Sequence, residues 1–420
     1  MPLLELDKQR FYSLAGQPMQ TIVVGGGYAG LRAVQLLAGQ NLPVILVEPR
    51  REHILRPRLV AAAAGRTALK EVSVPLARVL PTGVRHLQAT ALGFDPETAA
   101  VETDYEMLQG DRLVIAVGSE ANLSASGAPR YTLPLYSLED LQQALSHWAR
   151  LEDALQRERC DLSLLRWVIV GGGITGVELA AELVHLARRW RNRYGGLAEA
   201  IQIHLIQRGS RLLPDWPVQA SDWVTRWLKR HRVIVQTATA VRRVRADGVV
   251  LEGPAGPEEL ATQTVFWTGG SRPVRLEEEP ADLRDKSQFL RVDPYLRLVD
   301  YPRTYAIGDS VLPFNPQLNR TLPPCGQLAV RSAEVAAANI VAESRGEALT
   351  AFVPTIERIA LSLGAFDGLA VVDGQVLTGT AGWTVAQAAD LFYFNAIQNP
   401  LLARMAPELF SGTGLPSERQ

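Results

Sequence analysis

The chain has 420 residues, 47% hydrophobic and 21% charged, a balance typical of globular proteins that bury a large core. This length is enough for two or three domains of about 100–200 residues each. The formal net charge is -1, so charge gives no case for nucleic acid as a partner. The 2 cysteines, Cys160 and Cys325, exclude a disulfide-rich scaffold and argue against a cysteine-rich metal site, and reducing intracellular conditions are the simpler expectation.

The N-terminal segment, MPLLELDKQRFYSLAGQP, carries early acids and lacks an apolar stretch followed by a small-residue cleavage site. We therefore expect no secretory signal. No run of about 18 or more uninterrupted apolar residues occurs, so no spanning helix is expected either.

A unit of strand, glycine-rich turn, helix and strand occurs twice along the chain. The first copy comprises QTIVVG (20–25), a helix at 31–38 and the apolar run PVILVE (43–48). The second comprises RWVIVG (166–171), a helix at 177–188 and IQIHLIQ (201–207). This is the βαβ pattern, so the repeat predicts two nucleotide-binding domains.

Further elements follow from apolar runs and helical composition. The expected elements are strands at 111–118, 264–270 and 305–310, helices at 137–157 and 326–342, a loop at 313–324, strands around 370–377, and an aromatic segment from Trp383.

Gly25, Gly27 and Gly30 fit G-x-G-x-x-G directly after a strand and at the start of a helix. The first glycine permits the tight turn, the second lets the backbone approach a pyrophosphate, and the third lets helix and strand pack closely. The diphosphate would meet backbone N–H groups at the positive helix end. Glu48 ends the next strand, where a carboxylate can accept hydrogen bonds from a ribose.

The second copy uses Gly171, Gly173 and Gly176, but its second strand ends at Gln207, which is followed by Arg208 and then by Ser210 and Arg211. A carboxylate there would repel a 2′-phosphate, whereas an amide beside guanidinium groups would not. The pattern favours NADPH, or either nicotinamide nucleotide. The alternative is that these arginines are ordinary solvated surface charges.

The segments VVGGGYAGL, LVIAVGS, VIVGGGITGVELAAEL, VFWTGGSRP and YAIGDS, taken in this order, resemble the type II NAD(P)H:quinone oxidoreductases. The resemblance covers about residues 20 to 405. It implies an α/β fold with two Rossmann-like dinucleotide-binding domains, one inserted in the other, plus a small C-terminal domain. The implied boundaries are 18–135 and 290–345 for FAD, 136–289 for NAD(P)H, and 346–420 for a membrane or interface domain. Within this family the chain looks most similar to the cyanobacterial and plastid branch, whose members reduce prenylated quinones, including a naphthoquinone.

The resemblance also assigns roles to single residues. Asp309 in YAIGDS would bind the ribityl or phosphate part of FAD, and Gly118 would let the chain pass close to the flavin. Glu178 matches a glutamate near the nicotinamide and the quinone; the alternative is a first-turn acid favoured by the helix dipole.

Gln327 matches a family glutamine at the flavin edge. Arg331 stands where the family often has a second Gln or Glu, so it would either hold a quinone oxygen or be a solvated helix residue. The segment from His53 to Pro57 matches a stretch that lines the flavin in the family, with His53 expected to be structural rather than catalytic.

The acceptor is inferred partly from what the sequence lacks. No cysteine lies in residues 1–159, which excludes dithiol chemistry on the first helices of the flavin domain. No closely spaced metal-ligand set and no nucleophile elbow occurs. Transfer of a hydride from NAD(P)H to FAD, and then of electrons to a lipophilic quinone, needs no redox cysteine, no metal site and no protein nucleophile.

The segment 383–410 is rich in aromatic and aliphatic residues and carries few charges. It favours contact with a membrane interface by hydrophobic rather than electrostatic attraction. A dimer interface and a helix that covers the core are the alternatives. The resemblance implies a homodimer attached peripherally to the cytoplasmic side of a membrane, the thylakoid or plasma membrane for a cyanobacterial protein.

Two other functions stay open on the sequence alone. A sulfide:quinone oxidoreductase shares this fold and works through two cysteines, for which Cys160 and Cys325 are the candidates. A non-catalytic flavoprotein that senses redox state is the second alternative. The intact second glycine unit argues against the first of these, because sulfide oxidation needs no nicotinamide.

Overall fold

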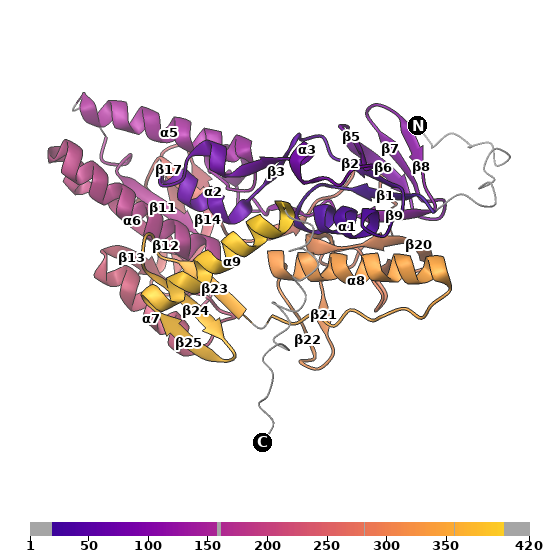
Figure 1. Ribbon diagram of the computed structural model, residues 1–420. Coiled ribbons are helices and arrows are strands. Elements are labelled where there is room, and N and C mark those ends of the chain that lie inside the picture. Colours follow the sequence, from indigo (N-terminus) through magenta and orange to yellow (C-terminus); the bar gives the residue numbers. More distant parts are fainter. Residues whose placement is uncertain (1–18, 158–160, 281, 357, 399–420) are drawn as a thin grey trace, which may run out of the picture. The chain divides into compact units, whose positions relative to one another are not determined.

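The computed structural model describes residues 19–157, 161–280, 282–356 and 358–398 (Figure 1). The described chain divides into two compact units. The first comprises residues 19–49, 80–117 and 275–354, and the second residues 50–79, 118–274 and 355–398. Each unit is therefore built from three separate stretches of the chain.

The first unit is built on a six-stranded sheet around the first glycine-rich turn. Its strand order is β19 (Arg297–Leu298), β20 (Tyr301–Ala306), β9 (Arg112–Ile115), β1 (Thr21–Val24), β2 (Val44–Val47) and β5 (Arg85–Leu87). All neighbours are parallel except β19 and β20. Every residue of β1 and β2 is buried, as expected for parallel strands covered on both faces.

Helices α1 (Tyr28–Ala38) and α8 (Gly326–Arg345) lie side by side against this sheet (Figure 1). An ion pair of 2.6 Å between Arg32 and Glu334 joins them. An antiparallel sheet of β6 (Ala91–Asp95), β7 (Ala100–Thr103) and β8 (Met107–Gln109) belongs to the same unit. The segment expected to be a loop at 313–324 contains a short hairpin, β21 (Phe314–Asn315) and β22 (Arg320–Thr321), so that expectation was only partly right.

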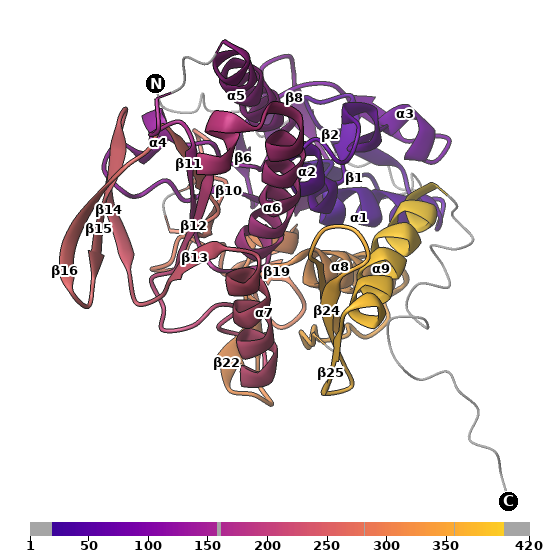
Figure 2. The same cartoon turned by 90° about the vertical axis from the view of Figure 1, so that its left-hand side faces the viewer.

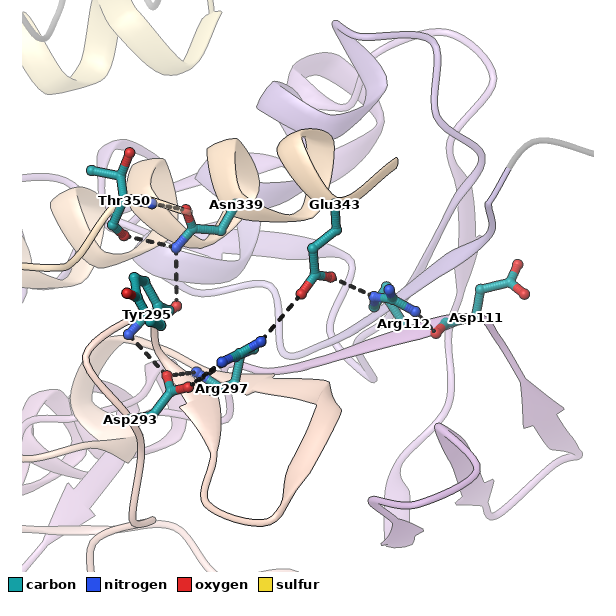
Figure 3. A network of polar contacts seen from close by, with 8 residues as sticks. All are labelled: Asp111, Arg112, Asp293, Tyr295, Arg297, Asn339, Glu343 and Thr350. Atoms are coloured by element: carbon teal, nitrogen blue, oxygen red, sulfur yellow. Dashed lines mark hydrogen bonds and ion pairs between the residues drawn. The ribbon is translucent and has the colours of Figure 1, made fainter. Parts of the chain in front are cut away.

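A polar network holds the C-terminal half of α8 in place (Figure 3). The carboxylate of Glu343 accepts a bond of 2.7 Å from Arg112 on β9 and lies 3.7 Å from Arg297. One turn earlier, buried Asn339 donates to the carbonyl oxygens of Tyr295 and Thr350 and accepts from the Thr350 N–H. These bonds join the last turns of α8 to β9 and to the segments around Tyr295 and Thr350.

The second unit repeats the parallel arrangement with β13 (Val233–Gln236), β12 (Gln202–Ile206), β11 (Arg166–Val170) and β17 (Thr264–Trp267), in that order. Its long helices are α5 (Leu138–Gln156), α6 (Ile174–Tyr194) and α7 (Val218–Arg230). Ser137 and Asp140 form a capping box that starts α5. Trp148, Trp167 and Trp190 meet in the core, with ring centroids 4.8–5.7 Å apart.

Smaller elements complete the second unit. A meander of β14 (Ala240–Arg245), β15 (Gly248–Gly253) and β16 (Gly256–Ala261) extends from it (Figure 2). The remaining short elements are the pair β10 (Ser119–Ala121) and β18 (Ser271–Pro273), helix α4 (Ala128–Tyr131), and the 3-10 turn η2 (Gly196–Ala200).

Residues 50–79 pack with the second unit. They form β3 (Glu52–Ile54), α2 (Arg56–Ala63), the 3-10 turn η1 (Leu69–Glu71), β4 (Ser73–Pro75) and α3 (Leu76–Val79). Helix α2 contacts α5 and α6, and the indole N–H of Trp148 donates to the Ala63 carbonyl at 2.7 Å. The compact units therefore differ from the boundaries expected from sequence, which assigned 50–79 and 118–135 to the first domain. The division by bound nucleotide stays a prediction.

The last described elements are β23 (Arg358–Ser362), β24 (Gly368–Val372), β25 (Gln375–Thr378) and α9 (Thr380–Gln398). Helix α9 packs on β23 and β24. Four apolar residues of the aromatic tail lie outside the described residues: Leu401, Leu402, Met405 and Phe410. The predicted α/β class with two Rossmann-like βαβ units is confirmed.

Candidate functional site

The first glycine-rich turn connects β1 to α1 and is closed by backbone contacts. Gly25 has φ +103°, and a Cβ there would lie 2.4 Å from the Ala116 carbonyl oxygen. A Cβ on Gly30 would lie 1.8 Å from the Gly25 carbonyl oxygen. Both positions exclude any side chain, because it would have to displace backbone.

Gly27 differs from these two glycines, because a Cβ at this position would meet no atom within 4 Å. It is the N-cap of α1 and has no side chain to cap the first helical turn. The open space therefore lies at the positive end of the helix, where backbone N–H groups bind phosphate. This is the geometry that a dinucleotide pyrophosphate requires.

Glu48 follows β2 and is 2% exposed. One of its carboxylate oxygens accepts the Gly26 N–H at 2.7 Å. The acid is thus fixed beside the glycine turn, as the ribose-binding role expected for it requires.

Asp309 lies in η3 (Gly308–Ser310), which packs against α1 and α8. The Gly308 N–H donates to the Ser332 hydroxyl at 2.9 Å, and Gly326 at the start of α8 lies against the ring of Tyr28. Asp309 also acts electrostatically on Cys325, the residue before α8. The first turns of α1 and α8 and the Asp309 turn therefore converge, and these residues fit a bound FAD.

Gln327 and Arg331 lie one turn apart on α8, both partly buried. Burial raises the pKa of the neighbouring Cys325 thiol, and the charge of Asp309 raises it further. This is opposite to the shift that activates a thiolate nucleophile.

The second cradle, between β11 and α6, reproduces the first. Gly171 has φ +110°, and a Cβ there would lie 2.6 Å from the Thr268 carbonyl oxygen. A Cβ on Gly176 would lie 1.8 Å from the Gly171 carbonyl oxygen, whereas at Gly173 it would meet nothing within 4 Å. The second unit therefore has its own phosphate cradle at the start of α6.

Gln207 takes the place that Glu48 has in the first copy. Its amide oxygen accepts the Gly172 N–H at 3.0 Å. The guanidinium group of Arg211 donates to the carbonyl oxygens of Trp216, at 2.8 Å, and Pro214, so it holds the turn together. Arg208 is exposed and has no ion pair among the described residues, so it is the cation of this turn that can meet a ligand.

Glu178 is partly buried on the first turns of α6 and accepts the Ser362 N–H at 2.9 Å. Burial raises the pKa of its carboxyl group to about 8, and the nearby carboxylates of Glu182 and Asp390 act in the same direction. The Ser362 bond and Arg66 act against this shift. A carboxyl group with a pKa near neutrality can hold and release a proton at working pH.

Two further residues from the sequence analysis have clear surroundings. His53 is 1% exposed on β3, and its ring nitrogen lies 2.9 Å from the Tyr393 hydroxyl of α9. Gly118 has φ +76° with open space where a Cβ would lie. Cys160 lies outside the described residues, and within the described part of the chain no three His, Cys, Asp or Glu side chains form a metal-binding group.

Sequence reasoning missed the charged residues that surround Glu178: Arg58, Arg66, Glu182 and Asp390. Arg66 and Glu182 are 116 positions apart, and Glu178 and Ser362 are 184 apart. No local spacing signals such contacts.

The cradles and the sheet order define a two-dinucleotide α/β oxidoreductase. The chain matches the pyridine nucleotide-disulphide oxidoreductase family over residues 19–338 and belongs to it. It is similar to the type II NADH:quinone oxidoreductase of Staphylococcus haemolyticus, with 26% identity over 379 residues, 87% of this chain and 92% of the relative. The Staphylococcus aureus enzyme of the same name is 24% identical over 376 residues, with the same shares of the two chains covered.

Two solved structures share the fold. NDH2 from Plasmodium falciparum in complex with NADH has a TM-score of 0.79 at 17% identity, covering 91% of this chain and 98% of that one. The sulfide:quinone oxidoreductase from Aquifex aeolicus has a TM-score of 0.78 at 18% identity, covering 96% and 100%. No helix within the described residues is long and apolar enough to cross a membrane.

Proposed function

We propose that this protein is an FAD-dependent NAD(P)H:quinone oxidoreductase. The observation that carries the proposal is the occurrence of two phosphate cradles of the same geometry, each with open space at the second glycine. The curated relatives named type II NADH:quinone oxidoreductase support the same reaction. Bound FAD would supply the capacity to accept a hydride and to pass electrons on, and the protein would supply binding, orientation and proton delivery.

In this proposal the first unit holds FAD. The first turn of α1 binds the pyrophosphate at Gly27, Glu48 binds the adenosine ribose, and Asp309 binds the ribityl or phosphate part. Gln327, at the start of α8, and Gly118 would contact the isoalloxazine part of FAD. Gly173 in the second unit binds the pyrophosphate of the nicotinamide nucleotide.

Reduction of a quinone takes two electrons and two protons. Glu178 would donate one proton from its carboxyl group and recover it from solvent, which its raised pKa allows at neutral pH, and the second proton would come from solvent. Arg331 would hold a quinone oxygen through its guanidinium group. Glu178, Gln327 and Arg331 are thus the proposed catalytic residues.

We also propose that NADPH is accepted along with NADH. The second cradle presents the neutral amide of Gln207 and the exposed guanidinium of Arg208 where an acid would reject a 2′-phosphate.

Replacing Arg208 with alanine should therefore weaken NADPH binding roughly tenfold, the loss expected for one charge-assisted contact, and leave NADH binding nearly unchanged. Calorimetric titration of both nucleotides measures this ratio without turnover. Arg242→Ala, on the β14–β15 hairpin, is a control for loss of one exposed cation. Equal losses for both nucleotides would show that Arg208 does not select between them.

The substrate is proposed to be a prenylated quinone of the naphthoquinone or plastoquinone type, drawn from a membrane to which the protein attaches peripherally as a homodimer. The C-terminal segment supports this, because α9 has Asp390 as its one charged residue and an exposed Leu391. A location on the cytoplasmic side of the thylakoid or plasma membrane is part of the proposal, and it rests on the resemblance to the cyanobacterial and plastid branch expected from sequence.

The test is anaerobic reduction of the purified protein. NADH and NADPH should each bleach the flavin absorbance, and a naphthoquinone or benzoquinone should restore it. A colourless protein after reconstitution with FAD would refute the proposal. Bleaching without reoxidation by any quinone would favour the flavin redox sensor instead.

A sulfide:quinone oxidoreductase remains the second candidate, because such an enzyme shares the fold. The raised pKa of Cys325 argues against it, since the thiolate is the reactive form. Sulfide-dependent quinone reduction that is lost in Cys325→Ser would favour this candidate.

A further inference from the structure

Three carboxyl groups and two arginines gather around the start of α6 in the second unit. The carboxyl groups belong to Glu178, Glu182 and Asp390, and the cations are Arg58 and Arg66. The proposed function uses only Glu178 from this cluster. The inference below rests on that proposed role and concerns what keeps a proton on this group.

Arg66 is bound to Glu182 in a bidentate ion pair. Its Nε lies 2.9 Å from each carboxylate oxygen, and one Nη bonds to the same carboxylate at 2.5 Å. The side chain of Glu182 is 2% exposed and that of Arg66 is 31% exposed, so the carboxylate of this pair is buried while the guanidinium group reaches the surface. This bond is the main cause of the raised pKa of Arg66. Both charges are therefore committed to each other.

Arg58 is committed in the same way to Asp390 on α9. Its Nε lies 2.9 Å from the carboxylate, and its guanidinium carbon lies 4.9 Å from the centre of the Phe394 ring. A second nitrogen donates to the Glu71 carbonyl oxygen at 3.2 Å. Because the group is bonded along its edges to Asp390 and Glu71 and has the Phe394 ring over one face, Arg58 is held against α9.

The charge balance then fixes the state of Glu178. Two arginines face three carboxyl groups, and each arginine has a carboxylate of its own. Glu178 receives one backbone N–H, from Ser362 on β23, and no guanidinium bond is formed to it among the described residues. An ionised third carboxylate would add an uncompensated negative charge beside Glu182 and Asp390, which burial makes costly.

We propose that Glu182 is a positioning residue: by holding Arg66 in a bidentate pair, it keeps that cation from Glu178 and so keeps the Glu178 carboxyl group protonated at neutral pH. The charged groups that act on Glu178 are Glu182 from α6, Arg66 from the segment after α2, and Asp390 from α9. Release of Arg66 is the one change within this set that would supply Glu178 with a counter-ion.

The test is Glu182→Gln in the full-length flavoprotein, read by infrared spectroscopy. Protonated carboxyl groups give C=O bands, and the band that is missing from the spectrum of Glu178→Gln is assigned to Glu178. In wild-type protein this band should persist to about pH 8. In Glu182→Gln it should vanish at a pH at least one unit lower, because freed Arg66 pairs with Glu178. The double variant Glu182→Gln/Arg66→Met should restore the wild-type midpoint.

Glu252→Gln is the matched control, since it removes the acid of an exposed ion pair with Arg242 in the same unit. It should leave the midpoint unchanged. A folded Glu182→Gln protein with an unchanged midpoint would overturn the inference. If that variant does not fold, Arg66→Gln should move the midpoint upward, and an unmoved midpoint there overturns the inference equally.

The pH profile of quinone reduction gives a second readout. If Glu178 donates the proton, the alkaline limb of the Glu182→Gln profile should shift to lower pH with the infrared midpoint. Quinone reduction that is absent from wild-type protein refutes the proposed function, whereas an unmoved infrared band refutes the positioning role of Glu182.

Discussion

At the scale of single residues, the glycines of each cradle have different physical reasons to be glycine. A Cβ at Gly25 would lie 2.4 Å from a backbone carbonyl oxygen, and a Cβ at Gly30 would lie 1.8 Å from one, so no side chain fits at either position. Gly27 has no such neighbour within 4 Å. The requirement at Gly27 and at its counterpart Gly173 therefore comes from a ligand rather than from folding.

This difference predicts that a methyl group at Gly27 or Gly173 leaves the fold intact and fills one cradle. Gly173→Ala should weaken NAD(P)H binding roughly tenfold or more and leave bound FAD in place, while Gly27→Ala should lower FAD affinity. Flavin content by absorbance and nucleotide titration by calorimetry separate the two effects. Each variant is the control for the other, because the two methyl groups have the same open surroundings but lie in different cradles.

Sequence alone predicted the glycine turns at Gly25 and Gly171 and the position of Glu48 after the next strand, because a βαβ turn has a fixed length. It also predicted that Gln207 ends the strand of the second copy at the place of Glu48, and the structure shows there a bond of 3.0 Å from the Gly172 N–H to its amide oxygen. It could not separate Arg208 from Arg211, since only the folded turn shows which guanidinium group is bonded to carbonyl oxygens. Ion pairs that join distant segments, like Arg66 with Glu182, leave no periodic pattern to detect.

At the scale of elements, α5 is fastened to β17 by a buried histidine. His147 is 8% exposed, and its Nε2 lies 2.7 Å from the Thr264 hydroxyl. Burial, helped by Arg150, lowers the pKa of His147 to about 4. The folded protein therefore keeps this ring neutral at a pH where the unfolded chain binds a proton.

The linkage gives a pH-dependent stability of known sign. Above about pH 6.5 the ring is neutral in both the folded and the unfolded protein, so His147 adds no pH dependence to the free energy of unfolding. As the pH falls from about 6.5 to about 4, His147 is protonated in the unfolded chain but not in the folded protein. The free energy of unfolding therefore falls by up to about 3 kcal/mol. Chemical denaturation at several pH values measures this loss.

His147→Gln should flatten that part of the stability curve. Burial also lowers the pKa of His185 and of His204. Both histidines are present in the wild-type protein and in His147→Gln, so the difference between the two stability curves isolates His147. Curves that stay parallel down to pH 4 would contradict the assignment.

The main elements were predictable because each βαβ unit combines an apolar strand, a glycine turn and an alanine-rich helix. The predicted helix at 177–188 is part of α6 (Ile174–Tyr194), and the one at 137–157 matches α5 within one residue at each end. The packing of residues 50–79 was not predictable, since α2 is short and its contacts with α5 and α6 depend on small residues such as Ala63 and Ala64 meeting Trp148. Side-chain volume at a distant position decides such packing.

At the scale of the whole molecule, the proposed membrane contact can be tested at α9. Leu391 is 56% exposed on a helix with a single charged residue. Leu391→Glu should reduce binding to phospholipid vesicles several-fold, because it places a charge in the interface. Added salt should change wild-type binding little, since no basic cluster on α9 contributes.

Vesicle co-sedimentation of the full-length protein measures this binding. Leu162→Glu places the same charge at a site that is 61% exposed and far from α9 in sequence, and it should leave binding unchanged. Equal binding by all three proteins would exclude α9 as the membrane contact.

The division of each unit into three chain stretches has a consequence for biosynthesis. The parallel sheet of the second unit lies wholly within residues 166–267, so its four strands are available as soon as that stretch leaves the ribosome. The sheet of the first unit needs β20, and its covering layer needs α8, which ends at Arg345. The N-terminal strands therefore lack β20 and α8 through most of translation, and apolar strand faces that stay uncovered for so long are the kind of surface that promotes aggregation.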